Sequence, residues 1–328
     1  MAVKIYVGGS WRSVSSIQVY TGGAWRTLNA LKVEVSGTWR DAWSAALQAY
    51  AAYNCGGYSP YLANITKLLF SSETVSQLSA TLSLARYGLG QIWSNNAGYL
   101  AGGQANLSIS SVIDKLTYST ETRSTISATL SAQRRDAVGS SSTSKGYFMN
   151  GFDGTNRLNS LESLTFSTEA RVTLSSSLAT KSHAGSCQSS SKGYSGSGYN
   201  NGAQNSISFV NFSTEASGNC SNSLGQSRYN PAATYSSTKG YWAGGMPSVN
   251  SIESLLFSNE TVGYVSQSYS NVGSGYGTSL TKGYFIAGSY TSNIYSFTFT
   301  TEAMQYMSVS QGYTSAYSSA VNYWSGSR

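Results

Sequence analysis

Charged residues are scarce in this chain, since lysine, arginine, aspartate and glutamate make up only 10% of its 328 residues. A typical soluble domain carries roughly 25%, so serine, threonine, asparagine, glycine and the 25 tyrosines must cover much of the surface. The 3 prolines are too few for a proline-rich linker. Strand and turn formers outweigh the residues that favour long helices. The composition therefore predicts an all-β protein.

Histidine, cysteine and clustered acids are also in short supply. His183 is the only histidine, and the 3 cysteines Cys55, Cys187 and Cys220 lie far apart without a CxxC spacing. We expect free, mostly buried thiols and neither a disulfide framework nor a zinc site. Calcium loops need clustered aspartates, which are absent. The sequence therefore predicts no metal and no cofactor.

The net charge of +7 reflects a shortage of acids, 13 against 20 lysines and arginines. The bases form no run, so we do not expect the chain to bind nucleic acid. No stretch approaches about 18 uninterrupted apolar residues, so we expect no membrane insertion. The N-terminal MAVKIYVGGS lacks the apolar region of a signal peptide. We expect a protein made in a cytoplasm that stays soluble or leaves by a route such as cell lysis.

Two markers recur in phase from about Tyr50 to the end of the chain. The first is an aromatic residue followed two positions later by Ser, Thr or Asn and then by a glutamate: Glu73, Glu121, Glu169, Glu215, Glu260 and Glu302. The second is a Gly-Tyr pair: Gly98-Tyr99, Gly146-Tyr147, Gly193-Tyr194, Gly240-Tyr241 and Gly283-Tyr284. Each unit resolves into four short strands, which is the pattern of a propeller blade. Because a lone blade cannot bury its faces, the blades must stack and close into a ring.

The repeats predict either six or seven blades. Six pairs of third and fourth strands accompany seven tyrosine-containing second strands, and residues 312–326 look like the first two strands of another blade. We expect strands from both termini to combine and close the ring. In the unit with Ser191-Lys192-Gly193, we expect a tight turn in which the glycine adopts a positive φ.

The double glycine after an aromatic strand resembles Kelch-like β-propellers. It occurs in Tyr99-Leu-Ala-Gly102-Gly103, in Tyr241-Trp-Ala-Gly244-Gly245 and in Tyr53-Asn-Cys-Gly56-Gly57. The tryptophan that Kelch blades carry after the third strand is missing, and Phe-Ser-Thr-Glu stands near that place. The resemblance implies the propeller architecture for residues 46–328.

A second repeat with a period of 14 occupies the first 43 residues. Each copy reads as a strand, a glycine-containing turn and a strand that begins with Trp-Arg, which is typical of a β-hairpin. Residues 1–45 are too few for a stable core of their own, so we expect them to anchor the protein to a partner or to sister chains. The anchoring residues are Trp11, Arg12, Trp25, Arg26, Trp39 and Arg40. This repeat resembles the Gly-x-Trp-Lys/Arg repeats of structural proteins in bacteriophage tails, which implies a virion localisation and assembly as a homo-oligomer with other virion proteins.

The acids argue against catalysis. Nine of the 13 belong to the long repeat, namely the six glutamates together with Asp114, Glu162 and Glu253. A glycosidase needs two carboxylates across the scissile bond, and no isolated pair stands out. No Gly-x-Ser-x-Gly motif marks a serine nucleophile. We therefore expect no enzyme activity, with a polysaccharide depolymerase as an alternative.

The repeat geometry distributes the remaining charges over two faces. On one face we expect exposed contacts between the six glutamates and Lys145, Lys192, Lys239 and Lys282. The opposite face carries basic residues near the end of the fourth strands and the most variable loops, residues 103–111, 151–160, 196–206 and 244–251. Loops on a rigid scaffold are where binding resides. The candidate ligand-binding residues are Tyr199, Asn200, Asn201, Gln204, Arg86, Arg134 and Arg228.

Three functions remain open from the sequence. The first is a bacteriophage tail fibre or tail tip subunit that binds a host surface glycan through the propeller loops. The second is a purely structural capsid or tail decoration protein that makes only protein contacts. The third is the depolymerase.

Overall fold

The computed structural model describes most of the chain. The described backbone covers residues 4–325 with gaps at 8–9, 14–16, 22–23, 29, 36–37, 45–47, 59, 272–274, 289 and 316, and the described side chains cover 50–323 with further gaps at 287, 313 and 315. The chain divides into two units, one of residues 1–48 with 325–328 and one of residues 49–324. Within the described part, no helix is long and apolar enough to cross a membrane.

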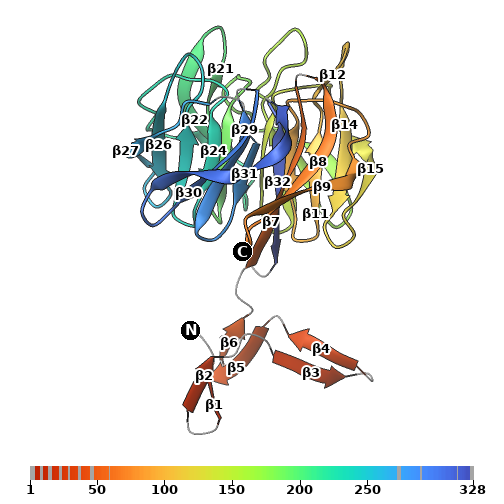
Figure 1. Ribbon diagram of the computed structural model, residues 1–328, viewed down its shortest axis with the longest axis vertical. Coiled ribbons are helices and arrows are strands. Elements are labelled where there is room, and N and C mark those ends of the chain that lie inside the picture. The colour runs from red at the N-terminus through yellow and green to blue at the C-terminus, as the bar shows by residue number, and fades with distance from the viewer. Residues whose placement is uncertain are drawn as a thin grey trace. The chain divides into compact units, whose positions relative to one another are not determined.

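The second unit is a β-propeller of six four-stranded antiparallel blades, which confirms the all-β prediction (Figure 1). Blade 1 contains β32 (Ser319–Ser325), β7 (Gln48–Gly57), β8 (Leu62–Leu69) and β9 (Thr74–Thr81). Blade 2 contains β10 (Gly90–Trp93), β11 (Ala97–Ala101), β14 (Val112–Thr117) and β15 (Thr122–Thr129), and blade 3 contains β16 (Val138–Ser141), β17 (Lys145–Met149), β18 (Leu161–Thr165) and β19 (Ala170–Thr173). Blade 4 contains β20 (Gly185–Gln188), β21 (Lys192–Tyr199), β22 (Ala203–Asn211) and β23 (Ser217–Asn219). Blade 5 contains β24 (Ala232–Tyr235), β25 (Lys239–Ala243), β26 (Ser251–Leu256) and β27 (Thr261–Ser268), and blade 6 contains β28 (Gly275–Thr278), β29 (Lys282–Gly288), β30 (Thr291–Thr298) and β31 (Ala303–Ser315).

Strands from both ends of the chain close the ring, as expected. The C-terminal β32 pairs with β7, so one late strand completes the three early strands of blade 1. Residues 312–326 therefore do not supply the two strands of an additional blade. Up to Ser315 they continue β31, which pairs with β30 as far as Thr291, and only β32 is left over. The count is six blades.

The first strand of each blade lines the propeller axis. All residues are buried in the first strands β10, β16, β20, β24 and β28. Successive first strands contact one another from β10 to β28. Fourth strands are largely exposed, and Figure 1 shows β15 and β27 at opposite margins of the propeller. We call the face with the second-to-third-strand loops and the connections between blades the upper face. A small hairpin of β12 (Gln104–Ala105) and β13 (Ser108–Ile109) extends from it (Figure 1).

The glycine of each Gly-Tyr marker is required by close packing between blades, and not by a turn. Gly193 and its equivalents lie within the second strands and are absent from the positions with positive φ, so the expected glycine turn is wrong. A Cβ on Gly146 would lie 2.2 Å from Cδ1 of Ile92, and a Cβ on Gly283 would lie 2.4 Å from Oγ1 of Thr234. The third residue of the first strands β10, β16, β20, β24 and β32 thus occupies the space that a side chain on the following blade's marker glycine would need.

The two repeat markers meet in six equivalent contacts between blades, which we call clasps, on the lower face of the propeller, opposite the upper face. Each marker tyrosine stacks on the aromatic residue of the next blade's Phe-Ser-Thr-Glu motif, with ring centroids 5.0–5.8 Å apart: Tyr53–Tyr118, Tyr99–Phe166, Tyr147–Phe212, Tyr194–Phe257, Tyr241–Phe299 and Tyr284–Phe70. Lysine side chains pair with the next blade's glutamate: Lys67–Glu121, Lys115–Glu169, Lys145–Glu215, Lys192–Glu260, Lys239–Glu302 and Lys282–Glu73. The predicted lysine–glutamate contacts are confirmed, but the paired side chains are half-buried and not exposed, and they join neighbouring blades.

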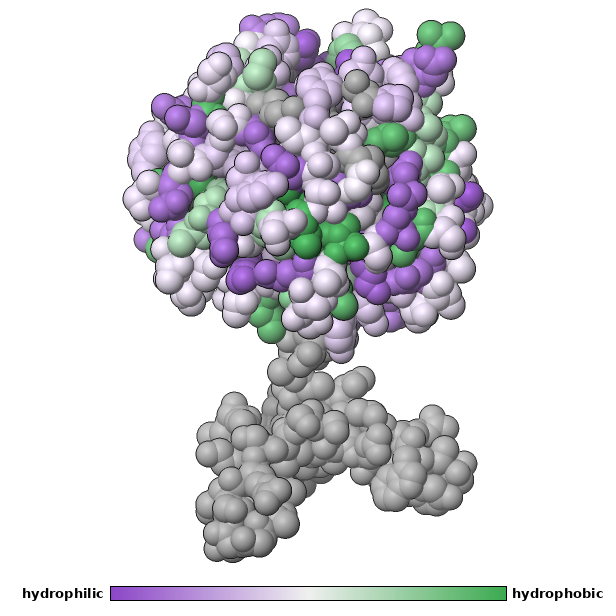
Figure 2. Space-filling view, in the orientation of Figure 1, coloured by the Kyte–Doolittle hydropathy of each residue, from purple (hydrophilic) through white to green (hydrophobic). Residues whose placement is uncertain are grey.

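The surface reflects the shortage of charge. Figure 2 shows hydrophilic and pale, weakly polar residues over most of the side of the propeller that faces the viewer, with hydrophobic residues scattered in small groups. Cys55, Cys187 and Cys220 are buried and free, as expected. The surface of the propeller is therefore polar with little charge.

Strands also form in the first unit. β1 (Lys4–Val7) pairs antiparallel with β2 (Ser10–Ser13), β3 (Ile17–Thr21) with β4 (Ala24–Leu28), and β5 (Ala30–Val35) with β6 (Thr38–Ser44). The anchoring residues Trp11, Arg12, Trp25, Arg26, Trp39 and Arg40 lie outside the described side chains. Their role stays a prediction.

Candidate functional site

The upper face has a rigid rim around the propeller axis. The residue two positions before each first strand adopts a positive φ of 52–65° in Gly88, Asp136, His183, Asn230 and Tyr317. Their backbones form a chain of hydrogen bonds around the axis: Gly88 N–H donates to Tyr317, Asp136 to Gly88, His183 to Asp136 and Asn230 to His183, over 2.7–3.1 Å. These four hydrogen bonds fix five blade connections against one another through the backbone alone.

A pocket of about 70 Å³ opens inside this rim. Asp136, His183 and Asn230 line it near the rim, and residues of the first strands line it deeper along the axis. The Tyr276 hydroxyl lies 3.2 Å from the Ser186 hydroxyl at the deeper level, and burial raises the pKa of Tyr276 to about 12. A cavity of this size holds a few waters or one small polar group.

On one side of the rim, an arginine contacts both an aspartate and an aromatic ring. The Arg135 guanidinium donates to Asp136 Oδ2 over 2.5 Å and lies 5.1 Å above the ring of Phe152. The backbones of Arg135 and Phe152 also hydrogen-bond to each other in both directions, which fixes this pair above blade 3. Burial acts to raise the pKa of Asp136, but the contacts with His183 and Arg135 outweigh it, so the pKa lies below its usual range.

The contacts continue around blades 3 and 4 and return to Asp136. The Arg157 guanidinium lies 5.6 Å from the Phe152 ring centre and 4.5 Å from that of Tyr199. Tyr199 packs edge-on against Tyr229 at 5.1 Å, and Tyr229 against His183 at 6.2 Å. His183 Nε2 lies 3.0 Å from Asp136 Oδ2, which completes the circuit. We call these residues the rim cluster: Arg135, Asp136, Phe152, Arg157, His183, Tyr199 and Tyr229.

Five tyrosines extend the rim cluster over the opposite blades. Tyr87 lies 5.9 Å below the Arg135 guanidinium and contacts Tyr58, Tyr61 and Tyr317 at 5.0–5.9 Å. Tyr290, 51% exposed, contacts Tyr58 at 6.4 Å. The upper face therefore presents half-buried aromatic rings and arginines around a polar pocket, a composition that favours ligand binding.

Only one of the predicted ligand-binding residues belongs to this cluster. Tyr199 is part of it. Asn200 and Asn201 lie in the adjoining turn between β21 and β22, and Gln204 is the second residue of β22. The Gln204 amide donates to the carbonyls of Asn200 and Gly202 over 3.3 and 3.2 Å, so it stabilises the turn itself. Asn201 is exposed and adopts a φ of 56°.

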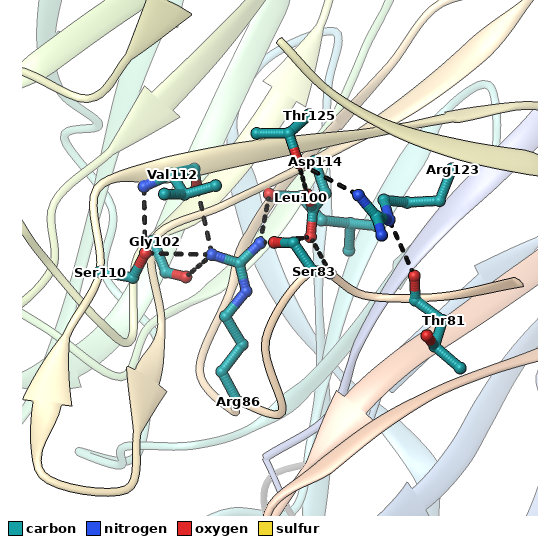
Figure 3. Close-up of polar contacts among 10 residues, drawn as sticks. All are labelled: Thr81, Ser83, Arg86, Leu100, Gly102, Ser110, Val112, Asp114, Arg123 and Thr125. Carbon is teal, nitrogen blue, oxygen red and sulfur yellow. Dashed lines mark hydrogen bonds and ion pairs between the residues drawn. The ribbon is translucent and has the colours of Figure 1, made fainter. Parts of the chain in front are cut away.

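The other three predicted residues, Arg86, Arg134 and Arg228, are buried, contrary to their expected place on an exposed face. Arg86 is 0% exposed and pairs with Asp114, whose Oδ2 is 2.8 Å from Nη2 (Figure 3). Its Nη1 donates to the carbonyls of Gly102 and Val112 in blade 2 (Figure 3), while its own backbone bonds to blade 1 at Gly57 and Leu62. The side chain thus joins two blades.

The same pairing recurs at two further joints. Arg134 pairs with Glu162 and Arg228 with Glu253, again with both partners buried. These carboxylates occupy the position four residues before the blade aromatic. Buried charges of this kind persist because they are paired and hydrogen-bonded. The exposed placement was wrong because a basic residue that recurs in phase with an acid is a structural pair of the repeat.

The joint between blades 3 and 4 departs from this pattern. Lys181 replaces the arginine and Ser208 stands in the acid's position. The Lys181 ammonium donates to the backbone carbonyls of Ser195 and Ser206 over 2.7 and 3.1 Å. Burial lowers the pKa of Lys181 to about 7, because no carboxylate stands beside it among the described residues.

The described acids are engaged by partners within the protein. The six repeat glutamates bind lysines, and Asp114, Glu162 and Glu253 bind buried arginines. Asp153 accepts backbone N–H groups of its own turn. Ser182 lies 2.8 Å from His183 Nδ1, but it is 1% exposed and its hydroxyl is shielded from an incoming substrate. No group of three metal-ligating side chains occurs within the described residues.

The sequence reasoning missed most of the rim cluster. Four of its seven members occupy the two positions after the repeat's basic residue, in Arg134-Arg135-Asp136, Lys181-Ser182-His183 and Arg228-Tyr229-Asn230. Aligning the repeats on the basic residue exposes the signal, because these two positions vary between blades while their neighbours recur. No protein-family model matches the chain, and no curated protein matches it.

Proposed function

We propose that this protein is a non-enzymatic binding subunit of a bacteriophage tail fibre or tail tip, which holds a host surface glycan on the upper face of its propeller. The observation that carries the proposal is the rim cluster, a closed circuit of aromatic rings and arginines around a polar pocket. Sugar rings offer C–H faces that pack on aromatic rings and hydroxyl groups that accept hydrogen bonds from arginine. Rings held by neighbouring blades lose little entropy on binding.

The carboxylates support a binding role over hydrolysis. A glycosidase needs one free acid and one free base or nucleophile across the bond. On the described upper face, Asp136 is held by His183 and Arg135, and Asp153 by the backbone of its own turn. The depolymerase is therefore the weaker proposal.

The virion context rests on the first repeat. Residues 1–45 resemble tail-protein repeats through their Gly-x-Trp-Arg units, and they would attach the propeller to other virion proteins or to sister chains. Trp11, Trp25 and Trp39 would supply the apolar contacts, and the arginines that follow them the polar ones. The propeller would then present its upper face to the host surface.

A second candidate is a structural decoration protein that makes only protein contacts. The observation in its favour is Leu107, which lies in the turn between β12 and β13 and is 94% exposed. A protruding apolar side chain of this kind suits insertion into a partner protein. The two candidates differ in what the upper face binds: a glycan in the first and another protein in the second.

The test is binding of the purified full chain to whole bacterial cells and to their extracted surface polysaccharides, with release of reducing ends assayed in the same samples. We expect binding without release, and at least about 10-fold weaker binding after Tyr199→Ala, since truncating a buried aromatic contact costs more than about 1.4 kcal/mol. Tyr306→Ala is the matched control, because Tyr306 is exposed on the outer strand β31. Binding of virion proteins but of no glycan would favour the decoration protein, and released reducing ends would favour the depolymerase.

A further inference from the structure

Arg157 is the one cation of the propeller whose charge the described structure leaves without a polar partner. Of the 14 lysines and arginines between residues 50 and 325, eleven form an ion pair with an acid. Arg123 and Lys181 lack an acid, but each donates hydrogen bonds to backbone carbonyls. Arg157 has neither within the described residues, and its Nε is buried without a hydrogen-bond acceptor.

The surroundings of Arg157 hold its guanidinium in place. It lies over the rings of Phe152 and Tyr199 at 5.6 and 4.5 Å, and such cation–π contacts fix its plane without using its N–H donors. Its side chain is only partly exposed. A cation that has lost water and gained no anion is destabilised until one arrives. The site is therefore preorganised for an anion that the protein itself does not supply.

The neighbouring charges do not neutralise it. Asp136 is engaged by Arg135 and His183, and Asp153 by the N–H groups of Thr155 and Asn156 at 2.7 and 2.6 Å. Arg135, which also lies 5.1 Å from the Phe152 ring centre, is itself paired with Asp136. Neither acid forms an ion pair with Arg157.

We propose that the glycan bound by the rim cluster is acidic, with a carboxylate or phosphate group paired with the Arg157 guanidinium and its sugar ring packed beside Tyr199 and Phe152. This inference rests on the proposed glycan-binding function and narrows its ligand. A planar guanidinium donates two parallel hydrogen bonds to either anion. A neutral glycan offers hydroxyl oxygens as acceptors but would leave the charge of the Arg157 guanidinium unpaired.

The experiment compares Arg157→Gln and Arg157→Lys with the wild-type full chain on the extracted polysaccharide of cells that the protein binds. We expect Arg157→Gln to weaken binding by about 10- to 100-fold, as for loss of a charged hydrogen bond. Arg157→Lys should recover part of the affinity, because charge remains but the two-pronged geometry is lost. Arg123→Gln is the matched control: it removes the same charge from an arginine that also lacks an acid partner and lies away from the rim. All variants should unfold at the wild-type temperature.

Removing one kind of charged group from the polysaccharide at a time identifies the anion that the protein binds. Samples whose carboxyl groups have been reduced to alcohols, and samples dephosphorylated with hydrofluoric acid, are compared with untreated polysaccharide at 50 and 500 mM NaCl. Loss of wild-type binding after one treatment assigns the carboxylate or the phosphate. Undiminished binding after both treatments, or an Arg157→Gln variant with wild-type affinity, would overturn the acidic ligand while the glycan-binding function stands. A wild-type protein that binds no polysaccharide would overturn both.

Discussion

The hydroxyl of Tyr284 in blade 6 donates a hydrogen bond to Glu73 of blade 1 over 3.0 Å, across 211 residues of sequence. Lys282 reaches the same carboxylate oxygen at 2.7 Å, and Phe70 stacks on the Tyr284 ring at 5.0 Å. This contact is the sixth of six equivalent clasps, and it joins the last blade to the first. The repeat markers therefore close the propeller as well as space its blades.

Tyr284 should contribute to stability chiefly through its ring. Tyr284→Phe keeps the stack on Phe70 and removes the bond to Glu73, so we expect a loss of about 1–3 kcal/mol in the free energy of unfolding. Tyr284→Ala also removes a buried ring and should cost about 3–5 kcal/mol. Urea unfolding measures both, with Tyr306→Ala as an exposed control. Equal losses for the two Tyr284 variants would contradict the role of the stack.

The contribution of the clasps to the free energy of unfolding should decrease at acidic pH. The hydrogen bond from Lys282 holds the pKa of Glu73 below its usual value of 4.5. Burial acts to raise the pKa of Glu260, but the contacts with Lys192 and Cys220 outweigh it, so this pKa is also lowered. Because the folded pKa is the lower one, the stabilisation is present above about pH 4.5 and is lost as the pH falls through the folded pKa values. The free energy of unfolding, measured from pH 7 to pH 3, should decline less steeply for Glu73→Gln/Glu260→Gln than for the wild type. An unchanged slope in the double variant would contradict the assignment.

Lys181 should make the protein more stable in mild alkali. Its pKa is lowered to about 7 in the folded state from a usual value of 10.5. Between these values the unfolded chain binds more protons than the folded one, so the free energy of unfolding rises with pH. We expect this rise between pH 7 and pH 9.5 in the wild type and its loss in Lys181→Met. Lys192→Met, at a half-buried clasp where the lysine is paired with Glu260, should retain it. A wild-type protein without the rise would show that Lys181 stays charged.

Packing between blades should be sensitive to single methyl groups at the marker glycines. A Cβ at residue 283 would meet Thr234, so Gly283→Ala should cost about 1–3 kcal/mol through overpacking. At the joint between blades 6 and 1 the small and the larger residue are exchanged, since the first strand carries Gly277 and the second strand that faces it carries Ala52. This exchange suggests a substitution that would rescue Gly283→Ala. Thr234→Gly combined with Gly283→Ala should therefore be more stable than Gly283→Ala alone. Thermal unfolding of the single and double variants measures this, and a double variant no better than Gly283→Ala would rule out steric exclusion.

The sequence by itself determined the repeats and hence the fold. Two markers in phase gave four-stranded units, and the requirement that each unit bury its faces gave a closed ring. It also determined which lysines and glutamates share a face, because turns in a meander alternate between faces. Those inferences depend only on local periodicity and chain direction.

The tertiary structure alone decided which residues meet across blades. Arg86 and Asp114 are buried partners, although both were visible in the sequence as repeated charges. Gly283 lies in a strand because Thr234 approaches it from another blade. Phe152 and Arg157 share the loop between β17 and β18, and Tyr199 at the end of β21 meets Arg157 only once blades 3 and 4 stand side by side. Contacts between segments far apart in sequence are set by the curvature and closure of the ring, which no single repeat contains.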